Sequence, residues 1–126
     1  MLPMDEFRQQ LLEAERILDT DFSFGLAEPT YVRCLELVKD NPGERFEFVR
    51  VMTTLLLEGR ISEEPIAFLM HKLRWPEVLE WAQRQLNSMA KPVLHGRPLA
   101  KIINAFSDDW ENKEFYKTFG GGPGTS

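Results

Sequence analysis

The sequence has little of what metal centres need. It contains one cysteine and two histidines in 126 residues. A single cysteine excludes an intramolecular disulfide framework and fits a reducing compartment, and a structural zinc site normally requires four closely spaced Cys or His ligands. Neither His71 nor His95 has a glutamate three residues before it, so the paired motif of di-iron helical bundles is also missing. We therefore expect no metal and no cofactor.

From the sequence we also expect no membrane span and no secretory leader. Its opening residues, Met1–Glu6, lack a basic region followed by an apolar stretch. No run of apolar residues approaches the roughly 20 that cross a bilayer. From these absences we expect a cytoplasmic protein that does not bind a membrane.

Motifs of the common catalytic folds are absent as well. We find no nucleophile elbow, no phosphate-binding glycine loop and no dinucleotide fingerprint. Cys34 could act as a nucleophile with a histidine as base, since such partners meet only in the fold. Its place in the middle of an amphipathic segment instead favours a small core residue. Acids at Asp108, Asp109, Glu111 and Glu114 suit the first turn of a helix, where the macrodipole favours them. The sequence therefore predicts no catalytic residue and no enzyme.

What the sequence does have is a strong helical pattern of apolar residues. Hydrophobic side chains make up 43% of it, which is typical of a packed interior. In Glu44–Glu58 the apolar residues cover most of a helical circumference and extend on the far side to Phe46 and Leu57. The polar stripe of this segment consists of Glu47, Arg50, Thr54 and Glu58. Such a helix is packed by neighbours on several sides, so we predict a central buried helix at residues 44–58, with Gly59 as its C-terminal cap.

Other segments read as shorter helices around this one. Periodicity, caps and prolines place them near residues 5–19, 29–40, 62–73, 76–89, 98–106 and 110–119. We expect a loop at residues 19–28 whose Phe22 and Phe24 tuck into the core, because each would otherwise forgo about 1.5 to 3 kcal/mol of burial. The prediction is an all-α fold, a compact bundle of six or seven short helices. Residues 1–119 would form one domain and residues 120–126 a flexible glycine-rich tail.

Charge is unevenly distributed along the chain. The net charge is −5, with 14 acidic and 7 basic residues in 1–66, 2 and 6 in 67–105, and 4 and 2 in 106–126. The basic residues of the span 72–101 are Lys72, Arg74, Arg84, Lys91, Arg97 and Lys101. Together with Trp75 and Trp81 they suggest a regulator that touches nucleic acid. A whole-chain pI near 5.1 opposes this interpretation, because an acidic chain repels a polyanion.

Binding to another protein requires less of the sequence. Trp and Arg most often dominate interface energetics, and Arg74-Trp75-Pro76-Glu77 places both at a corner between helices. The alternative is that Trp75 covers the end of the core. The residues that we predict for partner binding are Arg74, Trp75, Glu77, Trp81, Asp108 and Asp109.

The leading functional prediction is a non-catalytic helical module that binds another protein through acidic stripes that mimic or occlude a basic site. In size, acidity and helical make-up the chain resembles small bacterial adaptor and toxin-neutralising immunity proteins. This likeness is one of composition and carries over no residues. The nucleic-acid regulator is the second prediction, and an enzyme with an unrecognised site is the third.

Overall fold

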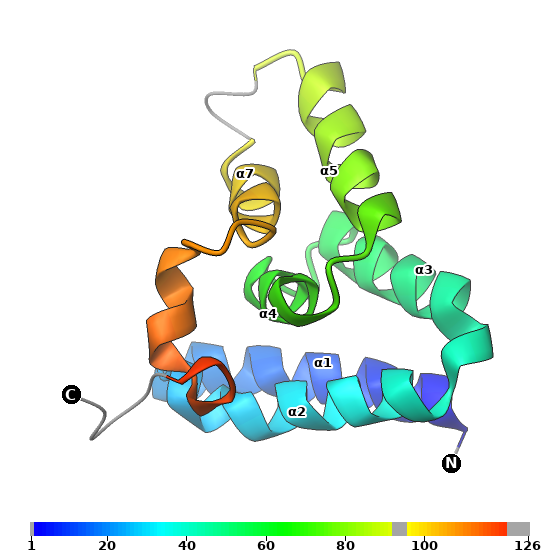
Figure 1. The fold of residues 1–126 in the computed structure, drawn as a ribbon, viewed down its shortest axis with the longest axis vertical. Helices are drawn as coiled ribbons and strands as arrows, with labels where there is room; N and C mark the ends of the chain where they lie inside the picture. The colour runs from blue at the N-terminus through cyan, green and yellow to red at the C-terminus, as the bar shows by residue number, and fades with distance from the viewer. Residues whose placement is uncertain (1, 92–95, 121–126) are drawn as a thin grey trace. The chain divides into compact units, whose positions relative to one another are not determined.

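The computed structural model describes residues 2–91 and 96–120, and within these ranges the chain forms helices and no β-strand. The all-α prediction is thus confirmed. The α-helices are α1 (Pro3–Asp21), α2 (Phe24–Asp40), α3 (Arg45–Leu57), α4 (Glu64–Leu73), α5 (Pro76–Ser88) and α7 (Arg97–Asn104) (Figure 1). The short 3-10 helices are η1 (Pro42–Glu44), η2 (Glu111–Phe115) and η3 (Lys117–Phe119). None of these described helices is both long and apolar enough to cross a membrane.

The contacts within the chain divide it into two compact units. Unit 1 comprises Met1–Ile61 and Glu111–Ser126, and unit 2 comprises Ser62–Trp110. The single domain expected over residues 1–119 stays a prediction. Gly120 ends η3 with a φ of 87°, and the rest of the predicted tail, residues 121–126, lies outside the described residues, as does His95.

Unit 1 is built on α1 and α2, which run antiparallel side by side (Figure 1). The buried face of α1 carries Phe7 and Leu11 at a spacing of four, so both side chains point the same way. Helix α3 packs on α1, where the ring of Phe7 meets the ring of Phe48 edge to face at 4.7 Å between centroids. The core of unit 1 therefore includes the hairpin of α1 and α2 together with α3, which packs on α1.

The loop predicted at residues 19–28 is largely helical. The Ser23 hydroxyl oxygen accepts a hydrogen bond from the Leu26 backbone N–H at 3.2 Å, and this cap starts α2 at Phe24. Pro29, predicted to open the helix, consequently lies inside it. Phe22 adopts a left-handed φ of 52° and its side chain is 85% exposed, so the prediction that it tucks into the core is wrong. Phe24 instead stacks on Phe115 at 5.1 Å.

Helix α3 is buried on one face and open on the other. Phe48, Val51, Met52 and Leu55 are buried, whereas Phe46 is 80% and Leu57 63% exposed. The prediction that neighbours cover this helix on several sides is therefore wrong for those two residues. The more fully buried segment is the first part of α4, where every residue from 64 to 70 is buried. Its signal was the unbroken apolar run at residues 66–70.

Unit 2 contains α4, α5 and α7, and α7 contacts both of the others. Helix α4 ends at Leu73, the following Arg74 turns the chain with a φ of 55°, and Pro76 begins α5 as predicted. Lys101 on α7 forms an ion pair with Glu63, just before α4, at 3.4 Å. The predicted helix at residues 110–119 belongs mostly to unit 1, where it is replaced by the two 3-10 helices η2 and η3.

Candidate protein-binding site

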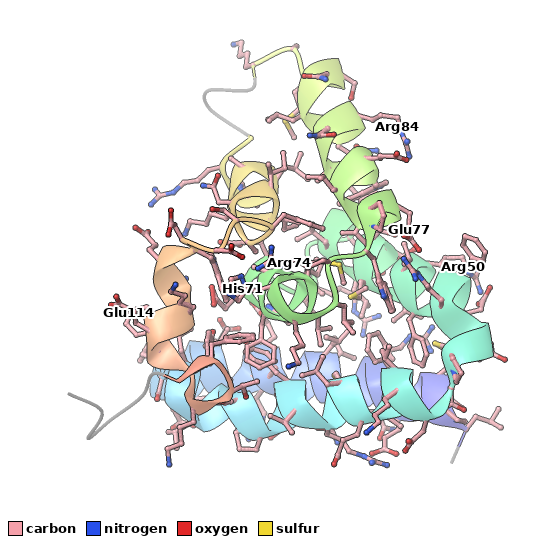
Figure 2. All side chains as sticks on the ribbon, in the orientation of Figure 1. Arg50, His71, Arg74, Glu77, Arg84 and Glu114 are labelled. Atoms are coloured by element: carbon pink, nitrogen blue, oxygen red, sulfur yellow. The ribbon has the colours of Figure 1, made fainter. Side chains whose placement is uncertain are left out.

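Of the residues predicted for partner binding, the structure joins Arg74 to Asp108 in unit 2. The Arg74 guanidinium donates hydrogen bonds to the carbonyl oxygens of His71 at 2.8 Å and Phe106 at 2.5 Å, and to Asp108 Oδ1 at 3.1 Å. His71 lies in the last turn of α4, and Arg74 is the residue that follows the helix (Figure 2). Arg74 therefore fastens the end of α4 to the segment that follows α7.

The other predicted residues divide between the interior and the surface. Trp75 is only 6% exposed, so it covers the end of the core and is not an open contact surface. Glu77 and Trp81 are half-buried on the first turns of α5, and Asp108 and Asp109 are exposed. The Ser107 hydroxyl oxygen accepts a hydrogen bond from the Asp109 N–H at 3.2 Å. A partner-binding role for these residues stays a prediction.

The groups that could do chemistry are held in structural contacts. The Nδ1–H of His71 donates to the Ala105 carbonyl oxygen at 2.7 Å, which fixes the proton on Nδ1 because a carbonyl only accepts. The Cys34 side chain is fully buried, and burial raises the pKa of its thiol to about 12. Such a thiol is a poor nucleophile. Among residues 2–91 and 96–120, no three His, Cys, Asp or Glu side chains gather as metal ligands.

A groove in unit 1 offers a more accessible site. We call it the α2 groove; it runs along the solvent side of α2 and has a volume of about 520 Å³. Its main lining residues are Leu26, Pro29, Val32, Arg33, Glu36 and Lys117. Pockets of this size accommodate small ligands or the side chains of a partner.

The apolar lining of the α2 groove is exposed. Leu26 is 59% exposed and Val32 36% exposed. They lie on the side of α2 away from its buried residues, among which are Tyr31 and Cys34. A spacing of six residues separates Leu26 from Val32 by about 9 Å along the helix axis. The same spacing sets the two side chains about 120° apart around the helix. Exposed Pro29 lies between them in the lining, so the three residues together form an exposed apolar surface.

The two ends of the α2 groove carry different charges. Arg33 donates to both carboxylate oxygens of Glu6, at 2.7 and 3.0 Å, and lies 3.4 Å from Glu36 Oε1. The hydrogen bonds from Arg33 lower the pKa of Glu6. Two carboxylates share one guanidinium here, so this end is net negative. Toward the start of α2 the groove is lined by Lys117 and by Glu28, whose formal charges balance, so this end is close to neutral. The Lys117 side chain forms no ion pair with any residue that the structure describes.

A buried carboxylate holds Lys117 in the wall of the groove. Glu28 Oε1 accepts a hydrogen bond from the Lys117 N–H at 3.0 Å. Glu28 Oε2 accepts two from Thr118, one from the N–H at 2.8 Å and one from the hydroxyl at 2.6 Å. The preceding Tyr116 is fully buried, and its ring contacts that of Tyr31 at 5.9 Å. We call this set of contacts the Glu28 clasp, and it completes the groove.

Sequence reasoning missed the α2 groove. The sequence predicts a loop at residues 19–28, so it does not place Leu26 on a helix, and the periodicity of α2 identifies only its buried stripe. The available signal was the pair Leu26 and Val32, apolar residues outside that stripe. No pattern in the sequence connects Glu28 with Lys117 and Thr118.

Comparisons with protein-family models, curated proteins and solved structures give no match to this chain. Function is therefore inferred from two places in the molecule. One is the α2 groove of unit 1, and the other is the set of contacts that Arg74 makes with His71, Phe106 and Asp108 in unit 2. The groove combines exposed apolar side chains with exposed charges, whereas the tryptophan beside Arg74 is buried.

Proposed function

We propose that this chain is a non-catalytic helical module that binds another protein, and that the partner docks in the α2 groove. The observation that supports this most directly is the exposure of Leu26 and Val32 in a groove whose ends differ in charge. Exposed apolar side chains gathered in one concave site are typical of interaction surfaces. An adaptor or a toxin-neutralising protein would be a particular form of such a module.

The occupant that best fits the α2 groove is an amphipathic helix of the partner. Side chains seven residues apart on a helix are separated by about 10.5 Å, close to the span from Leu26 to Val32. Full burial of an exposed Leu or Val side chain contributes about 1.5 to 3 kcal/mol. Since Leu26 is 59% and Val32 36% exposed, covering them contributes roughly 1 to 2 and roughly 0.5 to 1 kcal/mol, respectively. An acidic side chain at one end of that helix would face Lys117, and a basic side chain at the other end would face Glu36. These charges would set the direction in which the helix binds.

The distribution of charge favours a partner that is basic overall. Unit 1 contains 14 acidic and 9 basic residues, whereas unit 2 contains 6 of each. The net negative charge of the chain thus resides in the unit that carries the groove. Such a field accelerates the approach of a basic partner, and buried apolar contacts slow its release.

The nucleic-acid alternative for residues 72–101 has less support. Arg74 is engaged with backbone carbonyls and Asp108, and Lys101 is paired with Glu63. Trp75 is buried, so it offers no face on which a base could stack. A titration with nonspecific duplex DNA decides between the two functions. Binding that weakens steeply with added salt would favour the alternative, and no binding at low salt would remove it.

The protein-binding proposal is tested by capture from a native lysate with matched variants. Leu26→Glu places a charge in the groove, while Phe46→Glu makes the same change at an exposed apolar residue of α3 that does not line it. We expect Leu26→Glu to lose proteins that both the wild type and Phe46→Glu retain. Far-UV circular dichroism checks that both variants fold.

Two further results would redirect or refute this assignment. Retention of the same proteins by Leu26→Glu at undiminished strength would contradict docking in the α2 groove. Loss on Trp81→Ala combined with retention on Leu26→Glu would place the interface on unit 2, near the residues predicted from the sequence. Lys117→Glu adds a test of polarity, because it reverses the charge at one end of the groove.

A further inference from the structure

A second pocket of unit 1 is lined by three arginines from different parts of the chain. Arg8 comes from α1, Arg50 from α3 and Arg60 from the turn after α3, and the pocket has a volume of about 250 Å³. The side chain of Arg50 is labelled in Figure 2. Thr54, one turn after Arg50 on α3, and Glu58, the residue that follows α3, also line the pocket. We call this site the arginine pocket.

A turn at the end of α3 brings Arg60 to this pocket. The Gly59 N–H donates to the Leu56 carbonyl oxygen at 3.0 Å, and the Arg60 N–H donates to the Leu55 carbonyl oxygen at 2.9 Å. These two bonds form a Schellman motif, and Gly59 supplies the positive φ of 72° that the motif requires. The chain therefore folds back over the last turn of α3, and Arg60 lies on the same pocket as Thr54. The prediction that Gly59 caps α3 is confirmed, and the turn that it makes brings Arg60 to the pocket.

The arginines keep donors available despite their neighbours. Arg50 contacts Glu47 at 2.5 Å, and Arg8 lies 3.8 Å from Asp5, which is too long for a hydrogen bond. Arg60 forms no ion pair with any residue of the described ranges. Each guanidinium has five N–H donors, so one carboxylate neighbour does not exhaust them. Glu58 is the one acid among the lining residues. Together with Glu47 and Asp5 it balances the charge of the three arginines, so an anion would be held by the unused N–H donors and not by an excess of positive charge.

The arrangement of donors favours an anion that presents oxygens in several directions. A guanidinium matches phosphate oxygens with a two-pronged hydrogen bond. Donors from α1, α3 and the following turn approach from separate elements, and the Thr54 hydroxyl adds a neutral donor. A planar carboxylate has two oxygens in one plane, whereas a tetrahedral phosphate group can meet several donors at once. The volume equals that of roughly eight water molecules, which is enough for a phosphate group together with a short organic substituent or a few waters.

We propose that the arginine pocket binds a small phosphate-bearing anion, either free phosphate or a phosphate monoester. This proposal is independent of protein binding at the α2 groove, because the two sites share no lining residue. Phosphate would take up the free donors of Arg60 and compete with the long Arg8 to Asp5 contact. Bound phosphate would link α1 to α3 and to the turn that follows it.

The test is a titration of the full-length, ¹⁵N-labelled protein with inorganic phosphate, at an ionic strength held constant with sodium chloride. We expect saturable shifts of the amide signals of Thr54 and Arg60. Arg60→Gln should weaken binding about tenfold or more, because it removes a charge-assisted donor set. The matched control is Arg16→Gln, which also removes an exposed arginine of unit 1 but one that pairs with Glu13 away from the pocket.

The outcomes separate the possible sources of the phosphate and the ways in which the proposal fails. Tighter binding of O-phosphoserine than of inorganic phosphate would support a monoester as ligand, and the reverse would support free phosphate. Equal affinities of Arg60→Gln and wild type would overturn the proposal. So would shifts that do not saturate, or that sodium chloride alone reproduces, since these indicate unspecific screening.

Discussion

The Glu28 clasp gives the most direct test of how unit 1 is closed. Glu28 is buried, and its two carboxylate oxygens accept three hydrogen bonds from Lys117 and Thr118. Glu28→Gln preserves the shape of the side chain but replaces one oxygen by an NH₂ group. In either orientation of the amide, a donor then faces at least one of the backbone N–H groups. The variant therefore loses at least one bond and places two donors against each other.

The magnitude follows from the kind of bond that is lost. Hydrogen bonds to a charged group contribute about 1.5 to 3 kcal/mol, and an unsatisfied buried donor costs about 1 to 3 kcal/mol. For Glu28→Gln we expect a loss of about 2 to 3 kcal/mol in the free energy of unfolding of unit 1. With a urea m-value of about 2 kcal/mol per M, the midpoint falls by about 1 M or slightly more. Thr118→Val removes only the hydroxyl bond and should cost about half as much.

The assay is a urea titration in which unfolding is monitored by hydrogen exchange and mass spectrometry of peptides from α2. Peptides from α2 report on unit 1 alone. Tryptophan fluorescence would report on unit 2 instead, because all three tryptophans lie there. The matched control is Glu36→Gln, the same change at an exposed carboxylate of the same helix, which should stay within about 0.5 kcal/mol of wild type. Equal protection of α2 in Glu28→Gln and Glu36→Gln would refute the role given to the clasp.

Three further predictions concern the core and the charges. Trp75→Ala should lower the free energy of unfolding by about 3 to 5 kcal/mol, measured by circular dichroism in urea, and a change under 1 kcal/mol would mean that Trp75 is not core. Cys34 should react with a thiol reagent at pH 8 far more slowly in the folded protein than in urea, because its folded pKa is about 12; fast native labelling would contradict its burial. Arg33 lowers the pKa of Glu6 below its ordinary 4.5, so the pair stabilises the fold above that value and stops doing so as pH falls through the lowered pKa. The stability deficit of Arg33→Gln should accordingly shrink between pH 6 and pH 3, and a deficit independent of pH would exclude this ion pair as its cause.

The helices were predictable where strong local signals define their ends. Pro76 starts α5 because proline fixes φ near its helical value, and Gly59 closes α3 because glycine adopts a positive φ without steric cost. Burial was harder to predict, since periodicity shows which side of a helix is apolar but not whether a neighbour covers it. Phe46 and Leu57 extend the apolar arc of α3 in the sequence, yet both are exposed because no neighbour within the described part of the chain covers that side of the helix.

The candidate sites depend on contacts between residues far apart in the sequence, which is why little of them was predicted. The Glu28 clasp joins residues separated by 89 and 90 positions, and the arginine pocket joins α1 to the end of α3. Pro76 indicates the corner at Arg74 in the sequence. Arg74 and Asp108, which form an ion pair there, both belong to the residues predicted for partner binding. Whether Trp75 is core or surface could not be decided from the sequence, because either environment suits a tryptophan at the start of a helix.

Unit 1 is divided between two distant stretches of the chain, and this determines when it can finish folding during synthesis. On the ribosome, the partners of Glu28 are translated 89 and 90 residues after it, a delay on the order of ten seconds at usual elongation rates. Throughout that interval the nascent hairpin of α1 and α2 has no Tyr116 to cover its aromatic rings. Unit 1 is therefore completed only after the whole of unit 2 has been translated, and a message truncated within unit 2 would yield a hairpin with its apolar end open to aggregation.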